Sequence, residues 1–482
     1  MFDLDFNRPP PRPQALAEAQ QIIDVLWQAL GEAMGRIEKL EEQLNTDSNN
    51  SSNPPSSDSP KQRAERRKKP RSERARGAQP GHPRHERSVV AEADVDAVHR
   101  VFPADCEACG GPLWLQAEPA VRHQVFDLPE MRYQVSEYQL YAGDCPHCHQ
   151  RTTARLPDWV PSGQMGPGLV SWIGVLSGQF HLATRPIQRF LQEQWQLRFS
   201  VGAISQAQGK IIPWLAPLYH QIGTYVRQAD VAHADETTHY RGTERRWLWC
   251  LATPLAVYLL THYSRGKAAA LALLGQFSGV LVTDHYAGYN DYARHCRQLC
   301  WAHLIRRLER IAQRSGEAGA VGQRLLLIAQ GVLRTHHRRQ EGALPPARYH
   351  RRMRRLRTAL RAALERGQEC RTSTRTANQC RHLLNDEALY WTFLRDPHLP
   401  LTNNLAERAL RPYVIWRKLS FASQSYRGDQ FRPLVLSVIE TAKRLNMSTS
   451  RLFREVCTLG LSGQPITTRL PLPESAAPQL PQ

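Results

Sequence analysis

The chain has 482 residues, 41% of them hydrophobic, which is enough for a sizeable core and suggests two to four domains. Its formal charge of +19 favours a polyanionic partner such as DNA, although ribosomal and membrane-surface proteins are basic too. No stretch reaches the roughly 20 apolar residues of a membrane span, and the N-terminus lacks a basic region followed by an apolar one, so we expect a cytoplasmic protein with no membrane partner.

Residues 14–45 are predicted to form one helix. Its apolar residues recur at alternating spacings of three and four, the heptad pattern of a coiled-coil seam. They are Ile23, Leu26, Leu30, Ala33, Ile37, Leu40 and Leu44. A self-association helix that makes a homodimer or larger assembly and a helix packed on its own chain both fit this pattern.

Residues 46–88 are predicted to be a disordered basic linker. Asparagine, serine and proline dominate its first part, which cannot bury enough apolar surface to order itself. A run of cations follows, either a solvated tail or a site of non-specific phosphate contact. The residues that we expect to contact DNA are Arg66, Arg67, Lys68 and Lys69.

Residues 89–160 contain two CxxC pairs, Cys106 with Cys109 and Cys145 with Cys148. Four thiolates form a closed tetrahedral set suited to structural Zn²⁺, and a β-rich run from Val121 to Leu140 can span the gap as a ribbon. Four reduced, buried cysteines are the alternative, and His147 or His149 could replace one thiol.

Residues 165–225 read as helices over Gly168–Phe180, Arg185–Trp195 and Val201–Lys210, with Ser200 as the cap of the third. A helix-turn-helix-like DNA-binding region and three packed core helices both match this pattern. In the first case Gln206, Gln208 and Lys210 are the groups expected to face a DNA groove.

Residues 228–445 are predicted to form an α/β catalytic domain. Strands at Val231–Tyr240, Trp247–Thr253 and Ala256–His262 are followed by a helix over 266–276 and a fourth strand over 279–283. This order is that of a ribonuclease-H-like core, in which Asp235 and Asp284 lie side by side. A third carboxylate, Glu407, opens a helix that Asn403 or Asn404 caps.

An all-helical insertion is expected over residues 297–400, because the second and third carboxylates are 407 − 284 = 123 positions apart. After Glu407, the cations Arg411, Arg417 and Lys418 are placed to hold DNA. A final tail, 460–482, is rich in proline and is predicted to be disordered.

Several of these stretches resemble the signature blocks of the insertion sequence 66 (IS66) family of transposases, in the same order. The blocks are His233-Ala-Asp-Glu-Thr, Thr283-Asp-His-Tyr-Ala-Gly-Tyr, Cys300-Trp-Ala-His followed by Arg306-Arg307, and Asn403-Asn-Leu-Ala-Glu-Arg with Arg417-Lys418. The resemblance implies a DDE transposase whose catalytic residues are Asp235, Asp284 and Glu407. It also implies element-end DNA, target DNA and accessory proteins of the element as partners.

The resulting hypothesis is an enzyme that cuts and joins DNA with two Mg²⁺ or Mn²⁺ ions held by Asp235, Asp284 and Glu407. Glu236 is expected to be structural, and Asp291 is the acid to test next if Asp284 fails. The alternatives are a structure-specific nuclease of the same fold, which cuts without joining, and a catalytically inactive DNA-binding regulator.

Overall fold

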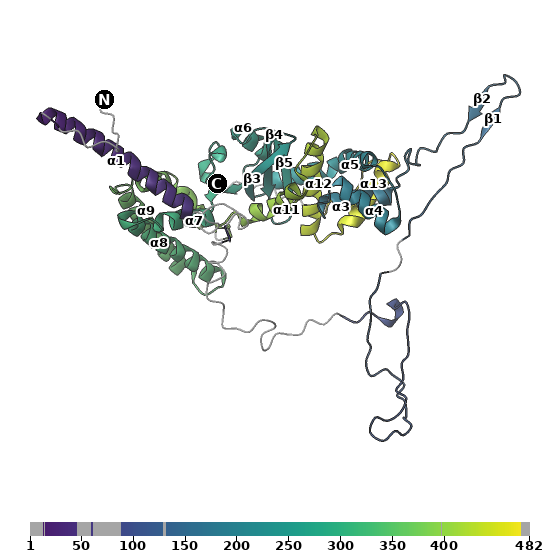
Figure 1. Cartoon of the computed structure of the whole chain (residues 1–482). Helices are drawn as coiled ribbons and strands as arrows, with labels where there is room; N and C mark the ends of the chain where they lie inside the picture. Colours follow the sequence, from purple (N-terminus) through teal and green to yellow (C-terminus); the bar gives the residue numbers. More distant parts are fainter. Residues whose placement is uncertain are drawn as a thin grey trace. The chain divides into compact units, whose positions relative to one another are not determined.

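The computed structural model describes residues 13, 15–45, 59–60, 88–128, 132–396 and 398–473 (Figure 1). The predicted DNA contacts Arg66, Arg67, Lys68 and Lys69 lie outside this part of the chain, as does most of the predicted linker. The chain divides into two units, one of Lys61–Ser136 and the other of Met1–Pro60 with Glu137–Gln482.

The first helix, α1, runs over Leu16–Asn45, so the predicted helix is confirmed. Its described seam side chains remain open to solvent, since Ile23, Leu26, Leu30, Ile37 and Leu40 are 41–55% exposed. An apolar heptad stripe that stays exposed within one chain is the surface a coiled-coil partner covers. Self-association through this stripe stays a prediction.

The core of the larger unit is a five-stranded sheet with the strand order β5-β4-β3-β6-β7. Its strands are β3 (Val231–Arg241), β4 (Glu244–Ala252), β5 (Val257–His262), β6 (Val280–Thr283) and β7 (Arg297–Leu299). Strands β3, β4 and β5 form an antiparallel meander, whereas β6 pairs with β3, and β7 with β6, in parallel. Helix α6 (Lys267–Leu274) connects β5 to β6, so the predicted order of strand, strand, strand, helix and strand is confirmed.

Strand β7 corrects the prediction that the helical insertion begins at residue 297, since its three residues extend the sheet. Two short 3-10 turns, η3 (Ala287–Tyr289) and η4 (Arg294–Cys296), lie between β6 and β7. A strand of three residues is too short for an alternating pattern to reveal it.

Besides α6, six helices of the described chain share one hydrophobic core with the sheet. They are α3 (Pro167–Gly178), α4 (Thr184–Trp195), α5 (Val201–Arg227), α11 (Asn404–Ser420), α12 (Tyr426–Arg444) and α13 (Thr449–Leu461). Helix α12 lies between β5 and α5, and α13 packs on α3 (Figure 1). The region predicted as 165–225 is therefore continuous with the core of the predicted catalytic domain.

Helix α5 is much longer than predicted. The Oγ of Ser200 accepts from the N–H of Ala203, as expected of a cap, but the helix continues beyond Lys210 through Pro213 and Pro217. A proline normally ends a helix. Here a stripe of fully buried apolar side chains outweighs that local preference, so the predicted end at Lys210 is wrong.

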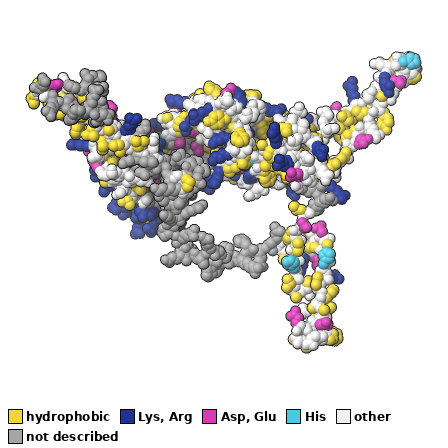
Figure 2. All heavy atoms as spheres, viewed as in Figure 1, with side chains coloured by type: hydrophobic (Ala, Val, Ile, Leu, Met, Phe, Trp, Pro, Cys, Tyr) yellow, Lys and Arg dark blue, Asp and Glu magenta, His cyan; other side chains and the backbone are white. Residues whose placement is uncertain are grey.

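The insertion is helical, as predicted, and has a hydrophobic core of its own. It consists of α7 (Trp301–Ala312), α8 (Gly316–Gln340), α9 (Pro346–Gly367), α10 (Thr374–Asn385) and the 3-10 helix η5 (Glu387–Leu394). The two ends of the insertion meet where the N–H of Trp301 donates to the carbonyl of Leu401 over 2.8 Å. Lys and Arg side chains gather over its α8–α9 side in Figure 2, where Arg351, Arg352, Arg354 and Arg355 are exposed.

The chain after α13 differs from the predicted disordered tail. Residues 464–473 have no helix or strand assignment, but Leu470 is buried in the main core, where its backbone N–H and C=O both bond to the side chain of Gln221 on α5. The prediction of disorder is wrong for 460–473, and residues 474–482 lie outside the described part of the chain.

The region of the CxxC pairs contains little regular structure. It has a 3-10 turn η2 (Glu92–Asp94) in the smaller unit and a hairpin of β1 (Ala142–Asp144) and β2 (Arg151–Thr153) in the larger one. The predicted ribbon over Val121–Leu140 carries no strand assignment in its described residues.

Candidate active site

The register of two parallel strands places Asp235 and Asp284 side by side. Val231, Ala232 and His233 of β3 pair with Val280, Leu281 and Val282 of β6. Continued by two residues, this register sets Asp235 opposite Asp284, which follows directly after β6. One carboxylate oxygen of Asp284 accepts the N–H of Tyr286 over 2.9 Å, which orients the side chain.

Glu407 lies in the first turn of α11. Asn403, the residue directly before this helix, attaches the helix to β3. The Nδ2 of Asn403 donates to the carbonyl of Ala234 over 2.8 Å, and its Oδ1 lies 3.2 Å from Nδ1 of His233. Asn403 occupies the cap position, but its side chain makes no capping hydrogen bond. It instead joins the start of α11 to the residue next to Asp235, which explains how the third acid reaches the first.

Asp235, Asp284 and Glu407 lie close enough for their negative charges to interact. Burial raises the pKa of Asp235 well above its ordinary value, and the charges of Glu236, Asp284 and Glu407 raise it further. Like charges held together in a desolvated site are unfavourable unless a cation compensates for them. The arrangement is therefore suited to a hard divalent cation with oxygen ligands.

A histidine that we did not predict also faces this group. His303 Nδ1 lies 3.7 Å from Oε1 of Glu407, and both atoms are buried without a hydrogen-bond partner in the described chain. Burial lowers the pKa of His303, which favours the neutral ring. Ligand atoms of Cys300, His303 and Glu407 all lie within 4.8 Å of one another.

The Cys300-x-x-His303 spacing at the start of α7 was a signal for this position. With His295 and Cys296, these residues also fit a separate metal site, but helical cysteine and histidine pairs are more often packed core residues. The structure sets His303 beside Glu407, although about 100 residues separate them in the chain.

Two neighbouring acids have partners of their own. Glu236 is buried, receives two hydrogen bonds from Arg265 at 2.9 and 3.1 Å, and accepts the Tyr289 hydroxyl at 2.8 Å. These contacts fit the structural role expected of Glu236. Asp291 pairs with Lys267 over 2.7 Å at the surface.

The predicted DNA contacts differ in their surroundings. Arg411 and Lys418 are exposed on α11, but Arg417 bonds to the hydroxyl and carbonyl of Thr238 on β3. On α5, Gln206 and Lys210 are exposed, whereas Nε2 of Gln208 donates to Ser177 Oγ over 2.8 Å. Arg417 is thus held against the strand that carries Asp235, and Gln208 faces α3.

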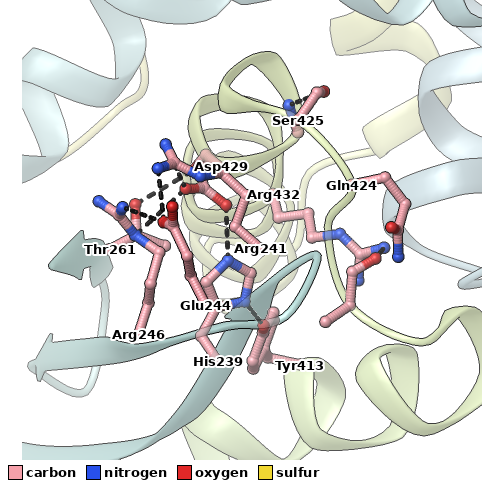
Figure 3. A network of polar contacts seen from close by, with 12 residues as sticks. His239, Arg241, Glu244, Arg246, Thr261, Tyr413, Gln424, Ser425, Asp429 and Arg432 are labelled. Atoms are coloured by element: carbon pink, nitrogen blue, oxygen red, sulfur yellow. Dashed lines mark hydrogen bonds and ion pairs between the residues drawn. The ribbon is translucent and has the colours of Figure 1, made fainter. Parts of the chain in front are cut away.

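A buried polar network joins β3 to α11 and α12 (Figure 3). His239, four residues after Asp235, bonds through Nδ1 to the hydroxyl of Tyr413 on α11 and through Nε2 to Asp429 of α12 over 2.8 Å. The other carboxylate oxygen of Asp429 lies 3.3 Å from Nε of Arg246 and 3.6 Å from Nη1 of Arg241. The network fixes the helix of Glu407 to the strand of Asp235 at a second point.

The two CxxC turns have the same backbone geometry. The N–H of Cys106 donates to the carbonyl of Gly111 and its carbonyl accepts from Gly110, and Cys145 bonds in the same way to Gln150 and His149. Backbone N–H groups lower the pKa of Cys106, chiefly that of Ala108, and of Cys145, chiefly that of Cys148. Each turn is suited to a bound metal, but the turns belong to different units, so a shared Zn²⁺ stays a prediction.

The sequence was compared with models of known protein families. A model of the transposase IS66 family matches residues 162–430, which include the sheet, all three acids and the insertion. The chain belongs to this family. A second model, of a family of unknown function (DUF6444), matches residues 8–88.

Three uncharacterized proteins of Sinorhizobium fredii are similar to the chain. The first, y4hP, is 25% identical over 388 residues, which are 71% of this chain and 68% of the relative. The others, y4jD and y4qI, are each 25% identical over about half of both chains: 48% of this chain and 50% of y4jD, and 45% of this chain and 45% of y4qI.

Membership of the transposase IS66 family implies a transposase-type enzyme that acts on DNA. Among the described residues, no helix is both long and apolar enough to cross a membrane.

Proposed function

We propose that the chain is a DDE transposase with a ribonuclease-H-like core, which cuts the ends of a bacterial insertion sequence and joins them to target DNA. The sheet order, with one antiparallel meander followed by two parallel strands, supports the core. The observation that carries the proposal is the convergence of Asp235 from within β3, Asp284 from the end of β6 and Glu407 from the start of α11.

The donor set fits two Mg²⁺ or Mn²⁺ ions. Three carboxylates supply hard oxygen ligands, and Glu407 Oε1 is buried without a hydrogen bond from any residue that the structure describes. When bound, such a pair of cations activates the attacking oxygen and stabilises the leaving oxygen of an in-line phosphoryl transfer. We therefore assign Asp235, Asp284 and Glu407 as the metal-holding catalytic residues.

The remaining residues position the DNA and the acids. Asn403 holds the first turn of α11 against β3, which fixes Glu407 relative to Asp235. Arg411 and Lys418 lie four and eleven positions after Glu407 on α11, so they share its helical face and can contact phosphates beside the reacting bond. Water then cleaves the phosphodiester at the element end, and the freed 3′-hydroxyl attacks the target.

The other parts of the proposal concern assembly. The exposed seam of α1 would join two copies, and Zn²⁺ held by Cys106, Cys109, Cys145 and Cys148 would support a module that recognises element ends. Lys210 and Gln206 would add contacts on α5. We place the protein in the bacterial cytoplasm on nucleoid DNA, with accessory proteins of the element as further partners.

Strand transfer in vitro tests the proposal. The assay uses the full chain, Mg²⁺, a fluorescent duplex with the element's terminal sequence and a supercoiled target, and compares wild type with Asp284→Asn. Asp291→Asn is the matched control, because Asp291 is a nearby acid in a surface ion pair. We expect joined product from wild type and from the control, and none from Asp284→Asn.

Other outcomes separate the alternatives. Joining by Asp284→Asn would remove this residue from the catalytic set. Cleavage without joining by wild type would indicate the structure-specific nuclease, and binding without either reaction would indicate an inactive regulator.

A further inference from the structure

Phe421 is an exposed aromatic residue in an unusual backbone conformation. It ends α11 with a φ of 53°, and Ala422 follows at 62°, in the left-handed region that residues other than glycine rarely adopt. Its side chain is 84% exposed although it is large and apolar. An energetically unfavourable conformation that presents an apolar ring to solvent is a feature that needs a reason.

The turn that carries Phe421 is fixed on both sides. Nη2 of the buried Arg432 donates to Ser420 Oγ over 2.8 Å and to the carbonyl of Ala422. Ser423 exchanges backbone hydrogen bonds with the β3–β4 hairpin, donating to Tyr240 over 3.1 Å and accepting from Gly242 over 2.8 Å. The ring is therefore displayed by an anchored turn.

Phe421 also ends a face of α11 on which cations and apolar groups alternate. The exposed side chains of that helix are Arg408, Arg411, Ile415, Lys418 and Leu419. Ile415 is 43% and Leu419 61% exposed. Cations bind phosphates, and apolar groups pack against the faces of bases. This mixture therefore fits DNA better than a second copy of the same chain, whose charge of +19 would repel it.

The distance from the acids is set by the helix. Phe421 follows Glu407 by 421 − 407 = 14 residues, which corresponds to about 21 Å at roughly 1.5 Å per residue. At about 3.4 Å per base pair this is about six base pairs of duplex. A DNA end whose scissile phosphate lies at the acids can therefore reach Phe421 while it follows the face of α11.

We propose that Phe421 is a stacking site for an unpaired nucleobase of the bound DNA, about six nucleotides from the reacting phosphate. The inference rests on the proposed function, because it takes DNA at the three acids as the ligand. Phe421 stacks on the base, Leu419 and Ile415 cover apolar sugar and base edges, and Arg411 and Lys418 contact the phosphates. The site is a positioning device for DNA and takes no part in the chemical step.

The test uses the full chain in EDTA and two fluorescein-labelled 30-base-pair duplexes that differ by one unpaired 2-aminopurine. Wild type should bind the duplex with the unpaired base more tightly and quench 2-aminopurine fluorescence on binding. Stacking of a base on an aromatic ring is worth about 5- to 150-fold in affinity. We expect Phe421→Ala to lose that preference and the quenching, and Phe421→Trp to retain both.

Two further variants make the result specific. Leu327→Ala removes another exposed apolar side chain, 63% exposed against the 84% of Phe421, from helix α8 of the insertion, and should change neither readout. Arg411→Ala should lower the affinity for both duplexes by the same factor, as expected of a phosphate contact. Circular dichroism confirms that each variant is folded before it is compared.

Two results would overturn the proposal. One is a Phe421→Ala variant with the preference and quenching of wild type. The other is a change in the molar mass of DNA-free protein caused by Phe421→Ala, which would make the ring a contact between copies. Neither result bears on strand transfer by Asp284→Asn, so failure of this site and failure of the proposed function are distinguished.

Discussion

Replacing Asp429 tests whether the buried network holds the two halves of the site together. Its side chain is 4% exposed and accepts a hydrogen bond from His239, which is fully buried. Burial is the main cause that lowers the pKa of His239, so the ring is neutral near pH 7 and depends on the carboxylate as its acceptor. Asp429→Ala leaves this ring without its acceptor and removes one of the two carboxylates, with Glu244, that pair with Arg241 and Arg246.

The expected loss follows from these contacts. A hydrogen bond to a charged group contributes about 1.5–3 kcal/mol. Removing one partner of a buried charge pair costs about 3–5 kcal/mol, because the other charge remains desolvated. The arginines are 18% and 26% exposed and keep Glu244 as a second carboxylate partner, so water and Glu244 partly replace Asp429, and we expect a total of about 3–4 kcal/mol.

Urea unfolding followed by circular dichroism measures this loss from the shift of the midpoint at constant slope. The matched control is Asp291→Ala, which breaks a shorter ion pair of 2.7 Å between side chains that are 46% and 61% exposed. The control should cost less than about 1 kcal/mol. Equal effects of the two substitutions, or a loss below about 1 kcal/mol for Asp429→Ala, would refute the reasoning.

Three further predictions concern metals and pH. Burial and neighbouring acids raise the pKa of Asp235, so its contribution to stability is full below about pH 4 and is lost as the pH rises through the folded-state pKa. Asp235→Asn should therefore unfold at a higher temperature than wild type at pH 7 in EDTA, with the gap closing toward pH 4; a gap independent of pH would contradict this. Mg²⁺ at about 100 times its Kd should stabilise wild type by about 2.7 kcal/mol and Glu407→Gln by much less, as thermal unfolding reports. Zinc bound by the purified chain should fall in Cys145→Ser and stay unchanged in Cys296→Ser by elemental analysis, and equal zinc in both would argue against the four-cysteine site.

The strands at the centre of the sheet could be predicted from the sequence because local patterns there agree with the tertiary structure. The strands around Asp235 are long, rich in apolar and β-branched residues, and separated by clear turns. Asp235 lies within the first strand, Asp284 directly follows the fourth and Glu407 opens a helix, all positions that the pattern marks directly. Their convergence could therefore be predicted before any distance was known.

Other features depend on contacts between distant segments. Helix α5 continues past Pro213 because its buried apolar side chains pack against the core. Leu470 is held by a hydrogen bond from Gln221, 249 residues away in the chain. His303 reaches Glu407 only because the insertion returns the chain to its starting point. No local periodicity encodes such partners, so sequence patterns alone could not supply them.

The closed insertion has a consequence for how the protein folds. Glu407 can join the sheet only after a loop of about a hundred residues closes, an entropic cost of about 4 kcal/mol for a flexible chain. Because the insertion has its own core and the N–H of Trp301 bonds to Leu401, its collapse brings both ends together beforehand. We expect core substitutions in the insertion, such as Met353→Ala, to slow refolding of the distant acidic site, which stopped-flow measurements can detect.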